Sequence, residues 1–302
     1  MRLRFTGHLP PGIGAKDLIL HAIGKLGTDA GRGYAIEYAG PPIAAMDMEQ
    51  RFTICNLSIE LGAKIGMIAP DDTTLHYLAG RAFAPRGREF ENASRVWRQL
   101  SSDPDAHFDR EYTIEADDVA PQITWGTSPQ DVISIDGRVP SPEREADLQR
   151  RARLQDALSY MGLTPDTPIA GLPVDWVFIG SCANGRLSDL RSAANILRGR
   201  KVAASVKAWA VPGSETVKRD AEAEGLDRVF RDAGFEWRAP GCSLCMAANG
   251  ETVPPGQRAI STSNRNFVGR QGPGARTHLA SPAMAAAAAI AGKIVDCRTV
   301  QG

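Results

Sequence analysis

Strand-like and helix-like segments alternate along this chain, and this alternation restricts the fold more than any other feature of the sequence. In the first part, strand and helix patterns follow one another at residues 3–5, 15–25, 34–38, 47–62 and 64–69. The second part repeats the order at residues 174–179, 187–197, 206–211 and from 215 onward. Strands that alternate with helices are typical of parallel sheets covered by helices. We therefore expect an α/β protein with mostly parallel sheets, whose ligands bind beyond the carboxyl ends of the strands.

A polar, turn-rich segment interrupts this pattern between residues 128 and 148. Turn-forming residues recur there at Pro129, Gly137, Pro140 and Pro142. Such a composition is typical of a linker, so we predict one domain at 1–127 and a second domain at 149–302. A chain of 302 residues is long enough for two domains with a core each.

Charge and hydropathy argue against several classes of partner. Lysine plus arginine (35) balances aspartate plus glutamate (35), and no basic run is present, which argues against nucleic-acid binding. The most apolar stretch, 283–291, is roughly half the length that crosses a bilayer. The first residues contain no apolar core of a secretion signal. We therefore expect a cytoplasmic protein that binds neither nucleic acid nor membrane.

Five cysteines stand in the sequence, and a reducing cytoplasm favours ligands, nucleophiles or core residues over disulfides. Cys55 and Cys297 have no partner nearby in the sequence, so we expect both to be small core residues. Cys182 follows the strand pattern at 174–179, where the start of the next helix favours a thiolate. Cys242 and Cys245 are separated by two residues, a spacing that also fits a redox pair or half of a zinc site.

The number of candidate thiolate ligands indicates the kind of metal site. Cys182, Cys242 and Cys245 make three. A structural zinc ion and an ordinary iron–sulfur cluster each take four protein ligands. Three thiolates on a cubane cluster leave one iron with open coordination positions. Such an iron can bind a hydroxyl and a carboxylate of a substrate and act as a Lewis acid.

Two further groups of polar residues suit an acidic substrate. Arg265 and Arg270 stand five apart in the polar segment 261–272, and arginine binds carboxylates through two parallel hydrogen bonds. Asn56 and Glu60 are four apart in the helical pattern at 47–62, so both side chains are expected on one helix face. The alternatives are a pair of surface arginines and a helix with a solvent-facing glutamate.

Five segments in this order resemble the aconitase superfamily of iron–sulfur hydro-lyases. They are Thr53–Glu60 (TICNLSIE), Met67–Thr74 (MIAPDDTT), Val177–Cys182 (VFIGSC), Pro240–Cys245 (PGCSLC) and Ser261–Gly272 (STSNRNFVGRQG). Residues 124–127 and 281–286 are similar to the branch that acts on 2-isopropylmalate in leucine biosynthesis. The resemblance extends over essentially the whole chain and implies two aconitase-like α/β/α domains.

The resemblance also implies roles for individual residues. Cys182, Cys242 and Cys245 correspond to the three ligands of a [4Fe-4S] cluster that has one open iron. Asn56, Glu60 and Asn264 correspond to residues beside that iron, of which we expect Asn56 and Glu60 to be catalytic. Arg265 and Arg270, with Asn264, correspond to substrate-binding residues. Alanine at Ala183, where the family usually has threonine, affects the hydrogen bonding around Cys182.

The implied activity is a hydro-lyase reaction that interconverts 2-isopropylmalate and 3-isopropylmalate by removal and return of water. Homoaconitate, citramalate and dimethylmalate remain open as substrates, and a truncated, non-catalytic cluster-binding module is a further alternative. Members of the superfamily carry an additional N-terminal domain with an Asp-Ser-His-Thr motif, which this sequence lacks. We therefore expect two partners, that missing domain and a small subunit that carries the base serine, and no activity without them.

Overall fold

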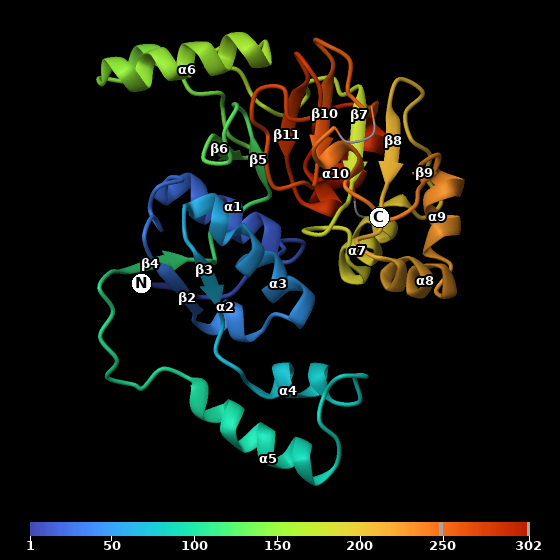
Figure 1. Ribbon diagram of the computed structural model, residues 1–302. Coiled ribbons are helices and arrows are strands. Elements are labelled where there is room, and N and C mark those ends of the chain that lie inside the picture. Colours follow the sequence, from blue (N-terminus) through green and yellow to red (C-terminus); the bar gives the residue numbers. More distant parts are fainter. Residues whose placement is uncertain (248–249, 301–302) are drawn as a thin grey trace.

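Two parallel sheets with covering helices make up the computed structural model, which describes residues 1–247 and 250–300 (Figure 1). The first sheet has the strand order β3-β2-β1-β4, and all its pairs are parallel. Its strands are β1 (Arg2–Thr6), β2 (Ala35–Ala39), β3 (Ile65–Met67) and β4 (Glu111–Glu115). Leu3 and Phe5 alternate with more exposed neighbours along β1, so one set of side chains lies in the core, as period-two burial requires.

The helices between β1 and β4 accompany this sheet, and the last two of them lie apart from it (Figure 1). They are α1 (Ala15–Leu26), α2 (Pro41–Ala44), α3 (Met48–Asn56), α4 (Asp72–Leu78) and α5 (Arg88–Trp97), with the short 3₁₀ helices η1 (Leu57–Leu61) and η2 (Arg98–Leu100). The buried face of α1 packs against α3 and η1 in one apolar core. Sequence analysis assigned no helix to the region of α4 and α5. The two helices bury little apolar surface, since Leu75 is the only buried residue of α4 and none of α5 is buried.

The single helix predicted at 47–62 is two elements in the structure. Asp47 caps α3 as expected, since its carboxylate accepts a hydrogen bond of 2.8 Å from the backbone N–H of Gln50. After Asn56 the chain tightens into η1. The Ser58 hydroxyl is 2.7 Å from the Tyr38 hydroxyl on β2, which draws this turn onto the sheet. Gly62 then ends the element with φ of 79°, a left-handed value that glycine adopts without strain.

A β-hairpin connects the two sheets. Its strands β5 (Gln122–Thr124) and β6 (Val132–Ser134) are antiparallel, and β6 lies inside the segment predicted to be a linker. The buried Asp131 carboxylate holds the turn, because it accepts from the backbone N–H groups of Thr127 and Ser128, both at 3.1 Å. The division of the chain into domains at 1–127 and 149–302 stays a prediction.

The second sheet has the strand order β11-β10-β7-β8-β9, again with every pair parallel. Its strands are β7 (Trp176–Ile179), β8 (Lys207–Ala210), β9 (Glu236–Trp237), β10 (Arg258–Ser261) and β11 (Arg276–Leu279). Its helices are α6 (Leu148–Met161), α7 (Leu187–Leu197), α8 (Glu215–Ala223), α9 (Leu226–Ala233) and α10 (Pro282–Ala291), with the 3₁₀ helices η3 (Pro142–Arg144), η4 (Ser243–Cys245) and η6 (Cys297–Thr299). The predicted α/β class with mostly parallel sheets is confirmed.

Helix α10 lies at the centre of the second core. Residues 282–289 are all buried, and α10 packs against α7 and β7 (Figure 1). Five consecutive side chains from Ala285 to Ala289 are methyl groups, so the neighbouring backbones can approach closely. No helix in the described residues is long and apolar enough to cross a membrane.

Replacing Ala286 with leucine tests this close packing. Ala286 is fully buried, so a larger side chain forces its neighbours apart and should cost about 1–3 kcal/mol in the free energy of unfolding. The matched control is Ala223→Leu on the exposed face of α8, which should change the free energy by no more than about 0.5 kcal/mol. Urea denaturation followed by circular dichroism measures both. Equal unfolding midpoints for the two variants would show that α10 is loosely packed.

Candidate active site at the carboxyl edge of the second sheet

Three loops leave the same edge of the second sheet, since its strands are parallel. Cys182 lies in the loop after β7, Cys242 and Cys245 in the loop after β9, and Arg265 and Arg270 in the loop after β10. Strand β10 is the neighbour of β7, and β9 is two strands away on the other side. The residues predicted as ligands and as substrate-binding groups therefore share the edge where α/β proteins bind their ligands.

The Cys242–Cys245 loop is a short turn that local hydrogen bonds stabilise. The backbone N–H of Cys245 donates to the carbonyl of Cys242 at 2.9 Å and closes the turn η4. Glu251 accepts hydrogen bonds from the Ser243 hydroxyl and from Arg238, whose guanidinium lies 3.8 Å from the ring centroid of Trp209. Cys242 is exposed and Cys245 is half-buried. A polar network thus fixes the backbone while leaving the thiols accessible.

Helix α3 of the first part holds the loop that carries Cys182. The hydroxyl of Thr53 donates to the carbonyl of Ala183 at 3.2 Å, and Arg186 donates to the same carbonyl at 2.6 Å. Arg186 also reaches the Thr53 hydroxyl at 3.1 Å. The Cys182 thiol itself is exposed, at a cavity of about 190 Å³ that is also lined by Glu49 and other residues of α3 and α8. Backbone contacts therefore orient the loop at the position where Ala183 replaces the usual threonine.

The arginine loop after β10 contacts both the cysteine loop and the first part of the chain. Arg270 donates from Nε to the carbonyl oxygen of Cys245 at 2.9 Å. Arg265 donates from Nε to a carboxylate oxygen of Glu60 at 2.9 Å. Asn264 lies half-buried in the same loop. Both arginine side chains are therefore half-exposed and hydrogen-bonded to other parts of the chain.

Glu60 is buried at this junction, which corrects one expectation. Its side chain is only 4% exposed, so the reading of a solvent-facing glutamate is wrong. Burial raises the pKa of the Glu60 carboxyl above its usual range, and the hydrogen bond and positive charge of Arg265 act in the opposite direction. The Lys16 and Arg270 charges also lower it. Glu60 is thus a buried carboxylate surrounded by cationic groups.

Asn56 does not share the surroundings of Glu60. The expectation of one helix face assumed a continuous α-helix, but α3 ends at Asn56 and Glu60 belongs to the 3₁₀ helix η1. A 3₁₀ helix turns by more per residue than an α-helix, so side chains four apart no longer align. As a result Asn56 is exposed while Glu60 is buried.

The three thiols suit an iron–sulfur cluster in their chemistry, although they do not form a closed metal site. Within residues 1–247 and 250–300, no three histidine, cysteine or carboxylate side chains converge closely enough to hold a metal ion. All three thiols are nevertheless free of disulfides, and two of them are exposed at one sheet edge. Thiolates are the ligands that hold iron–sulfur clusters in proteins. The donor set therefore fits a cluster held by Cys182, Cys242 and Cys245.

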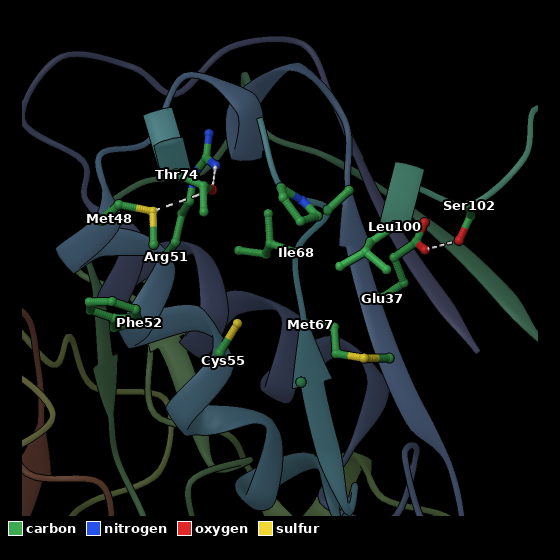
Figure 2. Close-up of a pocket in the computed structure, with 13 residues that line it drawn as sticks. Glu37, Met48, Arg51, Phe52, Cys55, Met67, Ile68, Thr74, Leu100 and Ser102 are labelled. Atoms are coloured by element: carbon green, nitrogen blue, oxygen red, sulfur yellow. Dashed lines mark hydrogen bonds between the residues drawn. The ribbon is translucent and has the colours of Figure 1, made fainter. Parts of the chain in front are cut away.

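The remaining two cysteines differ from each other. Cys297 is fully buried, as predicted for a core residue. Cys55 is only half-buried and lines a cavity of about 470 Å³, where it lies near Phe52, Ile68 and Met67 (Figure 2). Cys55 therefore packs against the first core from its rim, whereas the prediction placed it within the core. Burial raises the pKa of the Cys55 thiol to about 11.

Sequence analysis missed Lys16, the second residue of α1. Lys16 is 1% exposed, and its ammonium donates to the carbonyl oxygens of Ser263 at 2.8 Å and Thr262 at 3.3 Å. Burial lowers the pKa of this ammonium to about 8, and the Glu60 charge opposes that shift. A lysine at the start of an amphipathic helix normally lies in solvent. The only sequence signal was its place beside Asp17 in an otherwise apolar stretch.

These features define a member of the aconitase family. Residues 1–292 match that family, described as aconitase family (aconitate hydratase), so the chain belongs to it. A curated relative, 3-isopropylmalate dehydratase large subunit 1 of Bradyrhizobium diazoefficiens, is 65% identical over 301 residues, which is all of this chain. The chain spans 63% of the length of that relative. A solved structure, the holo form of aconitase X from Thermococcus kodakaraensis, covers 88% of this chain and 49% of its own at 11% identity. Its TM-score of 0.40 is too low to support an argument.

Alkylation of the reduced, metal-free chain tests the order of thiol exposure. At pH 8 iodoacetamide should modify Cys182 and Cys242 first, because both are exposed. Cys55 should react slowly, since a thiol of pKa about 11 is ionised in only about one molecule in a thousand at pH 8. Its rate should rise about a hundredfold between pH 8 and pH 10. Peptide mass spectrometry measures each site, with the urea-unfolded chain as control. Equal rates for Cys55 and Cys182 at pH 8 would contradict the assignment.

Proposed function

We propose that this chain is the cluster-binding portion of the large subunit of a [4Fe-4S] hydro-lyase. Its reaction is the interconversion of 2-isopropylmalate and 3-isopropylmalate in leucine biosynthesis, in the cytoplasm. The observation that carries the proposal is the hydrogen bond from Arg270 to the carbonyl of Cys245. This bond joins a cation suited to carboxylates to the loop with two of the three thiols. The name of the curated relative supports the choice of substrate.

In this proposal Cys182, Cys242 and Cys245 hold the cluster through their thiolates. When bound, the cluster supplies an iron with open coordination positions, which acts as a Lewis acid. Hydrogen bonds to neighbouring residues hold the loop backbones that carry these cysteines. The exposed positions of Cys182 and Cys242 leave room for the inorganic part of the cluster.

Arg265 and Arg270 bind the carboxylates of the substrate. Their guanidinium groups donate in a planar fork that matches a carboxylate, and both side chains are only half-exposed, so water competes weakly. Each contact to a charged partner contributes about 1.5–3 kcal/mol. Asn264, in the same loop, contacts the bound acid.

Glu60 acts on the hydroxyl that leaves the substrate. The buried Glu60 carboxyl has a pKa raised by burial, so it holds a proton more readily than an exposed glutamate and can pass it to a departing hydroxyl. Asn56 is exposed at the end of α3, apart from the surroundings of Glu60, so it has no part in this step. Removal of water also requires a base at the adjacent carbon. We assign that base and further proton-transfer groups to the partners, a small subunit and the rest of the large subunit.

Iron analysis of cysteine variants tests the cluster assignment. The chain reconstituted anaerobically with iron and sulfide should bind one [4Fe-4S] cluster, and Cys182→Ser should lose most of the bound iron. Cys55→Ala is the matched control and should keep the cluster, because Cys55 lies at the cavity between α3 and β3. Iron and sulfide counted per chain, with the visible absorption spectrum, give the result. Full iron loading of Cys182→Ser would refute the ligand set.

An anaerobic assay of 2-isopropylmalate conversion tests the activity. The cluster-loaded chain alone should be inactive, since each missing proton-transfer group typically contributes 10²–10⁴-fold. Activity should appear when the small subunit and the remaining part of the large subunit are added. In that assembly Arg265→Lys should lower kcat/KM by at least about tenfold, because a point charge does not replace a fork. Turnover by the isolated chain would place the proton-transfer groups within it, and an inactive assembly would favour a non-catalytic cluster-binding module.

Homoaconitate, citramalate and dimethylmalate are the alternative substrates in the same assay. The proposed carboxylate contacts of Arg265 and Arg270 fit any of these hydroxy acids. The relative rates with the four acids therefore decide the substrate, while the cluster and arginine assignments remain the same for each.

A further inference from the structure

Lys16 occupies a position that lysine normally avoids. It is 1% exposed, and no carboxylate in the described part of the chain lies within ion-pair distance of its ammonium. It stands in the first turn of α1, where the helix dipole is positive and disfavours a cation. Burial of an ammonium without an ion-pair partner is costly, and two carbonyl oxygens satisfy only two of its three N–H groups. Features that oppose folding in this way concentrate at functional sites.

The two carbonyl acceptors of Lys16 belong to the loop that carries the substrate-binding residues. They are those of Thr262 and Ser263, directly before Asn264 and Arg265. The Thr262 hydroxyl in turn donates to the carbonyl of Gly180 at 2.6 Å, in the loop of Cys182. Lys16 thus holds the backbone at the point where the chain turns from β10 toward Arg265. It belongs to α1, a helix that accompanies the first sheet.

The charge of Lys16 also concerns Glu60. Glu60 is buried, and its only ion-pair partner in the described residues is Arg265. Arg265 contacts Glu60 through Nε alone, so its two Nη groups remain free to bind a carboxylate of the substrate. Among the acidic groups, Glu60 has the largest electrostatic effect on the Lys16 ammonium.

We propose that Lys16 is a positioning residue of the hydro-lyase site. It fixes the backbone at residues 262–263 and thereby holds Arg265 where its free Nη groups can bind a carboxylate of the substrate. The second part of this inference rests on the proposed function. The first part, the fixed backbone, does not depend on it.

Hydrogen exchange on the chain alone tests the fixed backbone. Lys16→Met keeps the length and the apolar stem of the side chain but removes the donors. Amide exchange at residues 262–266 should become at least tenfold faster, while exchange in α10 stays unchanged. The control is Lys25→Met, at an exposed position of the same helix, which should leave the loop unchanged. Unchanged exchange of the loop in Lys16→Met would overturn the proposal whether or not the chain is part of a hydro-lyase.

Kinetics of the assembled, cluster-loaded enzyme test the effect on substrate binding. Lys16→Met should keep a normal iron content, because it changes no cysteine. Its KM for 2-isopropylmalate should rise at least tenfold, because the loop of Arg265 is no longer held, while kcat changes by less than threefold; Lys25→Met should leave both unchanged. A normal KM would overturn the positioning of Arg265. If the wild-type assembly has no activity, the proposed function fails, and the exchange experiment alone decides the positioning role. A variant that does not fold would show that Lys16 is needed for stability instead.

Discussion

The arrangement of the site depends on hydrogen bonds between the hairpin strand β5 and the end of the second sheet. The buried Thr124 accepts from the backbone N–H of Leu279 through its hydroxyl at 2.7 Å, and its carbonyl oxygen lies 2.6 Å from Nδ1 of His278. The Asn266 amide also donates to the Thr124 hydroxyl. One threonine therefore ties β11 and the arginine loop to the segment that follows the first sheet. Burial lowers the pKa of His278 to about 3, so the ring stays neutral and donates from Nδ1 to that carbonyl.

Residues of the first part complete the site at the edge of the second sheet. Glu60 and Lys16 come from η1 and α1, yet both act on the loop after β10. Neither sheet alone brings a carboxylate, two arginines and the thiols together. The hairpin segment connects the two sheets and also contacts the arginine loop through Asn266.

Much of this architecture could be predicted from local patterns. The apolar patterns located β1, β2, β3, β7 and β8 and the helices that follow several of them, but β4, β10 and β11 were not predicted. The motifs also identified Glu60, Arg265, Arg270 and Cys245, which lie in one region of the structure. The tightening of the chain after Asn56 could not be predicted, since it depends on the contact of Ser58 with Tyr38 in another element. The burial of Lys16 could not be predicted for the same reason, because its acceptors lie about 250 residues further along the chain.

The open edge of the first sheet has a consequence for how the isolated chain behaves in solution. Strand β3 ends that sheet, and both Ile65 and Met67 on it are about half exposed. An edge strand offers unpaired N–H and C=O groups. Ile65 and Met67 also make this edge apolar. A second chain can pair with such an edge in place of a native neighbour. During refolding of the isolated chain, folding of a single chain (first order) therefore competes with association of two chains (second order). The recovered yield falls as the protein concentration rises.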